Sequence, residues 1–221
     1  MTNRPLVLLF SAASFYLLTP TIALATEALV RPPYSLNSFN YNSPVTIGYA
    51  FRTPTIGTAL PKVTALGVWD QGGNGLTSSV DVGLWTDTGE LLRQVTVIAG
   101  QTAPLFDGFR YTSLGNTGPI LKANTIYVLG AFRRPGVPYS AAQTIEGIHF
   151  GVSPGFDILI ERASSDTGGI SFPNLTNDSD QALVGPNIRF DLVPEPTSAY
   201  LVVLATLGML RVRRTSRSAR R

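Results

Sequence analysis

Cysteine is absent from the 221 residues of the chain, which excludes disulfides, thiolate metal sites and cysteine nucleophiles. There is one histidine, so any histidine-dependent chemistry would rest on a single side chain. Charged residues make up 14% of the sequence, well below the usual proportion of about a quarter. Between the two ends, no long stretch repeats its apolar residues with the period of an α-helix. Together these absences point away from thiol chemistry and from a helical fold.

The net charge of +3 is unevenly distributed along the chain. Six of the 17 basic residues lie in 211–221, and Arg4 lies near the N-terminus. The ten that remain stand against 14 acidic residues, all between Glu27 and Glu195, so the body of the chain carries about −4. A basic protein with a basic stripe would suggest nucleic acid, but this body has no such stripe. We therefore expect no nucleic-acid partner.

The N-terminus has the three parts of a secretory leader. Arg4 is the positive residue, 6–18 is an uncharged apolar run, and Ala23-Leu24-Ala25 is a cleavage site of small residues. A membrane anchor is the alternative, but a spanning helix needs about 20 apolar residues and this run is shorter. The sequence predicts a signal peptide over 1–25, removed by signal peptidase after Ala25.

A proline-flanked glutamate opens the C-terminal tail, 193–221. Pro194 and Pro196 each fix φ and disfavour helix in the residue before them. Glu195 is therefore expected in an extended, accessible segment of the kind that a protease cleaves.

An apolar run over 198–210 follows the two prolines, and an arginine cluster over 211–221 follows the run. The run predicts a short transmembrane helix, since it carries no charge. The cluster predicts a cytoplasmic stop-transfer segment by the positive-inside rule, with the residues nearest the membrane being Arg211, Arg213 and Arg214.

Pro194-Glu195-Pro196, the short apolar run and the terminal arginines, in this order, resemble the PEP-CTERM sorting tail. The resemblance implies recognition by an exosortase, a membrane transpeptidase-like enzyme, with cleavage near the Pro-Glu-Pro motif. It also implies a Gram-negative envelope and an exopolysaccharide or biofilm context. The alternative is an ordinary single-pass anchor with a proline-rich stalk.

Between the ends, we expect an extended lead-in over 26–45 and one β-domain over 46–192. Short strand-like runs alternate there with clusters of glycine, proline and asparagine. The segment 87–90 predicts a hairpin between two of the runs. The expected strands cover 47–52, 62–69, 80–86, 91–98, 108–114, 125–132, 144–150, 156–163 and 187–193.

Eight to ten short antiparallel strands predict an all-β fold, an antiparallel β-sandwich that is jelly-roll-like, with a barrel as the alternative. The segment 48–133 also resembles a DUF4082-like β-sandwich module that recurs in PEP-CTERM proteins. That resemblance rests on the motifs at 63–70, 73–76, 82–85, 88–92, 108–111 and 125–130. It implies a fold and no activity.

The sequence gives only weak evidence for any set of catalytic residues. His149 has no Gly-x-Ser-x-Gly motif to accompany it, so a partly buried strand histidine is the better interpretation. Glu146, Asp157 and Glu161 could supply the two carboxylates of a glycosidase, but nothing marks them as a pair. We expect no catalytic residues and no enzyme.

Calcium is the one cofactor that the sequence suggests. Asp70 and Asn74, with Asp81 as a further candidate, offer oxygen ligands on a glycine-rich loop. The alternative is a loop in which Asp70 and Asn74 bond their own backbone.

Aromatic residues of the strands could stack on sugars if exposed, but Trp85, Phe109 and Tyr127 are expected in the core. The sequence thus predicts an exported, non-enzymatic protein of the cell surface or extracellular matrix. It would pass through a membrane-anchored intermediate and associate with exopolysaccharide. A carbohydrate-binding, lectin-like module or a carbohydrate-active enzyme is the alternative.

Overall fold

The computed structural model describes residues 27–31, 44–55, 59–134, 142–143, 151–164, 168–176 and 183–194. In these residues the protein is all-β, with fifteen strands, two short 3-10 turns and no α-helix. All strand pairings are antiparallel. None of the described segments forms a helix of the length and apolarity that a bilayer crossing requires.

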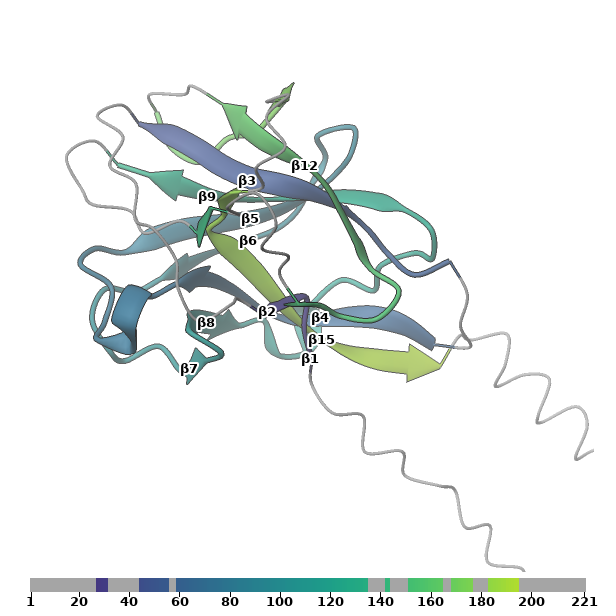
Figure 1. The fold of residues 1–221 in the computed structure, drawn as a ribbon, viewed down its shortest axis with the longest axis horizontal. Coiled ribbons are helices and arrows are strands. Elements are labelled where there is room, and N and C mark those ends of the chain that lie inside the picture. Colours follow the sequence, from purple (N-terminus) through teal and green to yellow (C-terminus); the bar gives the residue numbers. More distant parts are fainter. Residues whose placement is uncertain are drawn as a thin grey trace, which may run out of the picture.

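Two larger sheets lie one above the other as layers (Figure 1). Across the six-stranded sheet the order is β13 (Leu175–Thr176), β12 (Asp157–Ser164), β3 (Val45–Arg52), β9 (Ile126–Arg133), β5 (Val80–Thr86) and β6 (Leu91–Val97). Across the five-stranded sheet it is β1 (Glu27–Ala28), β15 (Pro186–Pro194), β4 (Ala59–Trp69), β8 (Phe109–Ser113) and β7 (Leu105–Phe106).

Short elements complete the described chain. Two pairs of two-residue strands stand apart from the larger sheets: β2 (Val30–Arg31) with β11 (Gly151–Val152), and β10 (Ala142–Gln143) with β14 (Leu183–Val184). The two 3-10 turns are η1 (Gln71–Gly73) and η2 (Gly115–Thr117).

One hydrophobic core joins the two sheets. Because side chains alternate between the faces of a strand, every second residue of β3, β5 and β9 points toward the five-stranded sheet. Burying each of these large side chains stabilises the fold by about 1.5–3 kcal/mol. The largest fully buried members are Tyr49, Phe51, Leu84 and Leu129 from the six-stranded sheet, and Val63, Leu66, Phe109, Ile188 and Phe190 from the five-stranded sheet.

A second, smaller cluster covers the outer face of the six-stranded sheet. Trp85 lies over Gly83 and Gly130, where a Cβ at Gly83 would come within 2.3 Å of the indole. Phe172 packs against the indole, with ring centroids 6.2 Å apart. The segment 168–176 therefore covers part of the outer face of this sheet, around Trp85.

The strand predictions agree closely with the structure. The 80–86 strand is β5, and the other runs within the described residues match their strands to within a few residues. The 87–90 hairpin is confirmed: Thr86 N–H donates to the Glu90 carbonyl at 2.9 Å, and Gly89 takes a φ of +91°. Only a residue without Cβ adopts that φ without strain. The predicted strand at 144–150 lies outside the described residues.

The N-terminal part of the predicted lead-in belongs to the sheets. Glu27 and Ala28 pair with Phe190 and Arg189 at the edge of the five-stranded sheet. Leu29 and Val30 are fully buried in the main core. These residues are extended as expected, but they complete the domain instead of preceding it. The leader residues Ala23 and Ala25 lie outside the described residues.

Candidate functional site

A loop built around Asp70 follows β4. The Asp70 N–H donates to the Gly108 carbonyl at 2.8 Å, and its own carbonyl accepts from Gly73 N–H at 3.0 Å. Gly72 and Gly75 take φ values of +79° and +109°, in the left-handed region that favours glycine. The glycines of the sequence Gln-Gly-Gly-Asn-Gly thus allow the chain to turn tightly around the aspartate.

Arg110 reaches from β8 into this loop and, with its four acceptors, forms what we call the Arg110 cluster. Its Nε donates to Asp70 Oδ2 at 2.6 Å. Its Nη1 donates to the carbonyls of Gln101 and Ala103 at 2.9 and 2.8 Å, and its Nη2 to that of Gly73 at 3.0 Å. The arginine side chain is 5% exposed and the aspartate side chain 2%. A single guanidinium therefore binds two separate loops.

Further hydrogen bonds stabilise these two loops, the one around Asp70 and the one that contains Gln101 and Ala103. Gly75 N–H donates to both carboxylate oxygens of Asp70, at 3.0 and 3.3 Å. Leu76 and Gly100 exchange two backbone bonds of 2.8 and 3.2 Å. A buried ion pair offsets its desolvation only when such additional hydrogen bonds are present. The cluster meets that condition, because Asp70 and Arg110 each form hydrogen bonds beyond the ion pair.

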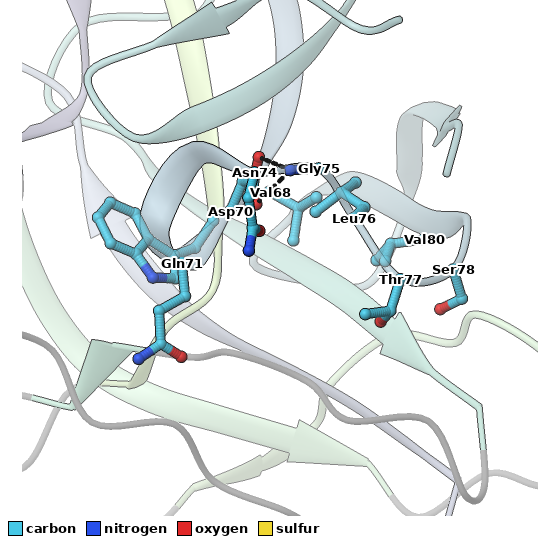
Figure 2. A pocket seen from close by; sticks show the side chains of 10 residues that line it. Val68, Asp70, Gln71, Asn74, Gly75, Leu76, Thr77, Ser78 and Val80 are labelled. Carbon is cyan, nitrogen blue, oxygen red and sulfur yellow. Dashed lines mark hydrogen bonds between the residues drawn. The ribbon is translucent and has the colours of Figure 1, made fainter. Parts of the chain in front are cut away.

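A pocket of about 330 Å³ opens beside the Arg110 cluster, and we call it the loop pocket. Val68 of β4, Leu76 and Val80 of β5 supply apolar side chains to its wall. Figure 2 shows Thr77 and Ser78 in the same part of the view as Val80, and the two hydrogen bonds between Asp70 and Gly75. The complete lining is Val68, Trp69, Asp70, Gln71, Asn74, Gly75, Leu76, Thr77, Ser78 and Val80.

The structure places both predicted calcium ligands on the wall of the loop pocket. Asp70 is committed to Arg110 and Gly75, so a cation at its carboxylate would have to displace a guanidinium. Asp81 accepts from the Thr96 hydroxyl at 2.6 Å on a different strand pair. Among the residues described, no three histidine, aspartate or glutamate side chains gather as a metal site would require. Asp70 thus acts as an internal acceptor, and calcium stays a prediction of the sequence.

The candidate acid and base residues are not brought together by what the structure describes. Asp157 is exposed at the first position of β12. Glu161 lies on the same strand, opposite Tyr49. His149 and Glu146 lie outside the described residues. The described residues therefore do not show two of these carboxylates facing each other as a glycosidase site would require.

The aromatic side chains lie mostly inside. Trp85, Phe109 and Tyr127 are 3%, 0% and 5% exposed, which confirms that they are buried, Phe109 and Tyr127 in the main core and Trp85 in the smaller outer cluster. Trp69 is half-buried, and its ring packs edge-on against Phe109 with centroids 5.1 Å apart. These rings are engaged with their neighbours, so they do not form an exposed platform for sugar rings.

Arg189 and Tyr111 form a second cluster of polar side chains, on the five-stranded sheet. The guanidinium carbon of Arg189 is 4.3 Å from the ring centroid of Phe106 and 5.8 Å from that of Tyr111. Burial raises the pKa of Tyr111 above its ordinary value of 10.0, although the charge of Arg189 opposes the shift and that of Asp107 adds to it. The buried Tyr111 hydroxyl has no hydrogen-bond partner among the described residues.

The sorting motif lies at the boundary of what the structure describes. Pro194 is the last residue of β15, is exposed and pairs with Ala59. Glu195, Pro196 and the arginines Arg211, Arg213 and Arg214 lie outside the described residues.

Comparisons with protein-family models, curated proteins and solved structures found no match to the chain. The similarities of the tail to PEP-CTERM and of 48–133 to the DUF4082-like module therefore remain resemblances. What the chain does is inferred from its own residues.

Arg110 is the site residue that sequence reasoning missed. It lies between Phe109 and Tyr111 in a strand run where its neighbours are buried. An arginine in such a run is the sequence signal that could have identified it, since a buried charge needs a partner. The pairing itself depends on a separation of 40 residues in sequence, which no local pattern shows.

Proposed function

We propose that the chain is an exported, non-enzymatic protein of the cell surface or extracellular matrix, sorted through its tail by an exosortase and associated with exopolysaccharide. One observation carries the proposal. A leader with a small-residue cleavage site at Ala25 stands at one end, and Pro194-Glu195-Pro196, an apolar run and an arginine cluster stand in order at the other. The membrane-anchored form is then an intermediate between export and release or surface attachment.

The geometry of β15 supports the sorting part of the proposal. Its last residue, Pro194, is exposed and is also the first residue of the Pro-Glu-Pro motif. A processing enzyme needs its substrate segment extended and accessible. Pro194 meets this need, because it is extended in β15 and exposed, and it is followed in the sequence by Glu195.

The finer fold assignment belongs to the same proposal. β3 pairs with β12 and β4 pairs with β15, so the early strands of the domain lie beside the late ones. Such pairings between the beginning and end of the chain support a β-sandwich of jelly-roll style. A rigid all-β body is suited to a surface or matrix role. No observation in the described ranges favours a carbohydrate-active enzyme.

Mass spectrometry of the mature protein from its native host tests the proposal. The expected native mass corresponds to a chain that begins at Thr26 and ends near Pro194. A variant with Pro194→Ala, Glu195→Ala and Pro196→Ala should keep its full tail and remain in the membrane fraction. Glu90→Ala, which changes an exposed glutamate in the β5–β6 hairpin, is the matched control and should be processed normally. A native protein that keeps 211–221 would identify the tail as a plain anchor, and the proposal would fail.

A further inference from the structure

The loop pocket lies at the lower end of the size range of small-molecule sites and is partly open to solvent. Ligand pockets in proteins hold about 300–1,000 Å³ and combine an apolar wall with a few placed polar groups. The loop pocket measures about 330 Å³, which suits one ring-sized unit. Its apolar wall comes from Val68, Leu76 and Val80, and its polar groups include the side chains of Asn74, Thr77 and Ser78.

The polar lining selects for hydroxyl groups. The Asn74 amide carries two donors and an acceptor, and the hydroxyls of Thr77 and Ser78 each donate and accept. A ligand whose own groups both donate and accept would satisfy such a lining from any of several orientations. Hydroxyls on a compact ring have this property, and the ring carbons between them can lie against Leu76 and Val80.

The electrostatics of the loop pocket select against charged ligands. Asp70 is the only ionisable residue in the lining. Its charge is compensated by Arg110 at 2.6 Å, and both side chains are almost completely buried. A cationic ligand would therefore meet no free carboxylate, and an anionic ligand would meet no free guanidinium, because Arg110 donates to Asp70 and to three carbonyls.

The Arg110 cluster also lowers the ordering cost of binding on the Asn74 side of the loop pocket. Loops that must become ordered on binding lose affinity, whereas a loop already held in place does not. Here the backbone on both sides of Asn74 is fixed, at Gly73 by Arg110 and at Gly75 by Asp70. We propose that the loop pocket is a binding site for one unit of a neutral saccharide. This inference does not depend on the sorting of the tail.

The test uses the full-length chain purified in a polyoxyethylene detergent, because glucoside detergents would compete for the site. The probes are neutral methyl hexopyranosides, with methyl glucuronide as the charged analogue and N-acetylglycinamide as a peptide analogue. Saturation-transfer NMR detects weak binding, and titration up to about 10 mM covers the millimolar range expected for a single unit. At least one neutral hexoside should bind, and the uronide and the amide should bind more weakly or not at all.

Substitutions in the lining locate the binding. Asn74→Ala combined with Thr77→Val should weaken binding at least about tenfold, since hydrogen bonds from both side chains to the ligand would be lost. Asn116→Ala combined with Thr102→Val is the control, because both residues are exposed and lie outside the loop pocket. The control should bind as the unaltered protein does. Binding of no neutral hexoside, preference for the uronide or the amide, or equal binding by the two double variants would overturn the inference.

Discussion

Replacing Arg110 with methionine tests whether the Arg110 cluster holds the loop end of the domain together. The substitution keeps the length and apolar contacts of the side chain and removes four donated hydrogen bonds. Asp70 would be left with its charge buried and uncompensated, and removal of one partner from a buried ion pair costs about 3–5 kcal/mol. We therefore expect the free energy of unfolding to fall by about 4 kcal/mol, a shift of roughly 8–16 °C in Tm for a domain of this size.

Urea unfolding followed by tryptophan fluorescence measures this loss. Arg93→Met is the matched control, because Arg93 also donates to two carbonyls, those of Leu92 and Thr117, but is exposed. Exposed interactions of this kind contribute at most about 1 kcal/mol. The double variant Asp70→Asn, Arg110→Met should recover part of the lost free energy of unfolding, since the uncompensated carboxylate charge at position 70 is then removed. If Arg110→Met cost no more than Arg93→Met, the cluster would have no special structural role.

Two further substitutions probe the sheets. Tyr111→Phe should leave the fold unchanged or stabilise it by about 1 kcal/mol, because it removes a buried hydroxyl without a described partner. Since the folded pKa of Tyr111 lies above the unfolded value of 10.0, its contribution to stability is complete below pH 10 and lost as pH rises above it. The phenylalanine variant should therefore lose less stability than the parent between pH 9 and roughly pH 11 in urea titrations, and an equal loss would contradict this assignment. Gly48→Ala should destabilise by about 3 kcal/mol, because its Cβ would lie 1.8 Å from the Leu129 carbonyl oxygen. Gly168→Ala has open space around it and should be neutral in the same thermal melt, so similar Tm values for the two would refute the close approach of β3 and β9.

Local patterns in the sequence predicted most of the strands. Alternating apolar residues placed β5 at its observed bounds, and the Asp-Thr-Gly-Glu turn placed its hairpin with β6. These signals are local because the side-chain period of a strand and the φ of a turn glycine depend only on neighbouring residues. The burial of Trp85 and Phe109 was predicted from the tendency of large aromatic side chains on strands to be buried, and not from the alternation, which puts Trp85 on the face opposite Val82 and Leu84.

The sequence alone also determined the processing hypothesis, because a leader, a proline-flanked glutamate and a terminal arginine cluster are read from their order in the chain. The tertiary structure decided the candidate site. Asp70 meets Arg110 across 40 residues, and the loop pocket opens between β4 and β5 only when both sheets are in place. The role of Asp70 as an ion-pair partner instead of a free oxygen ligand follows from that contact. Composition and spacing cannot show such a pairing, because burial and charge compensation are properties of segments distant in sequence that folding brings together.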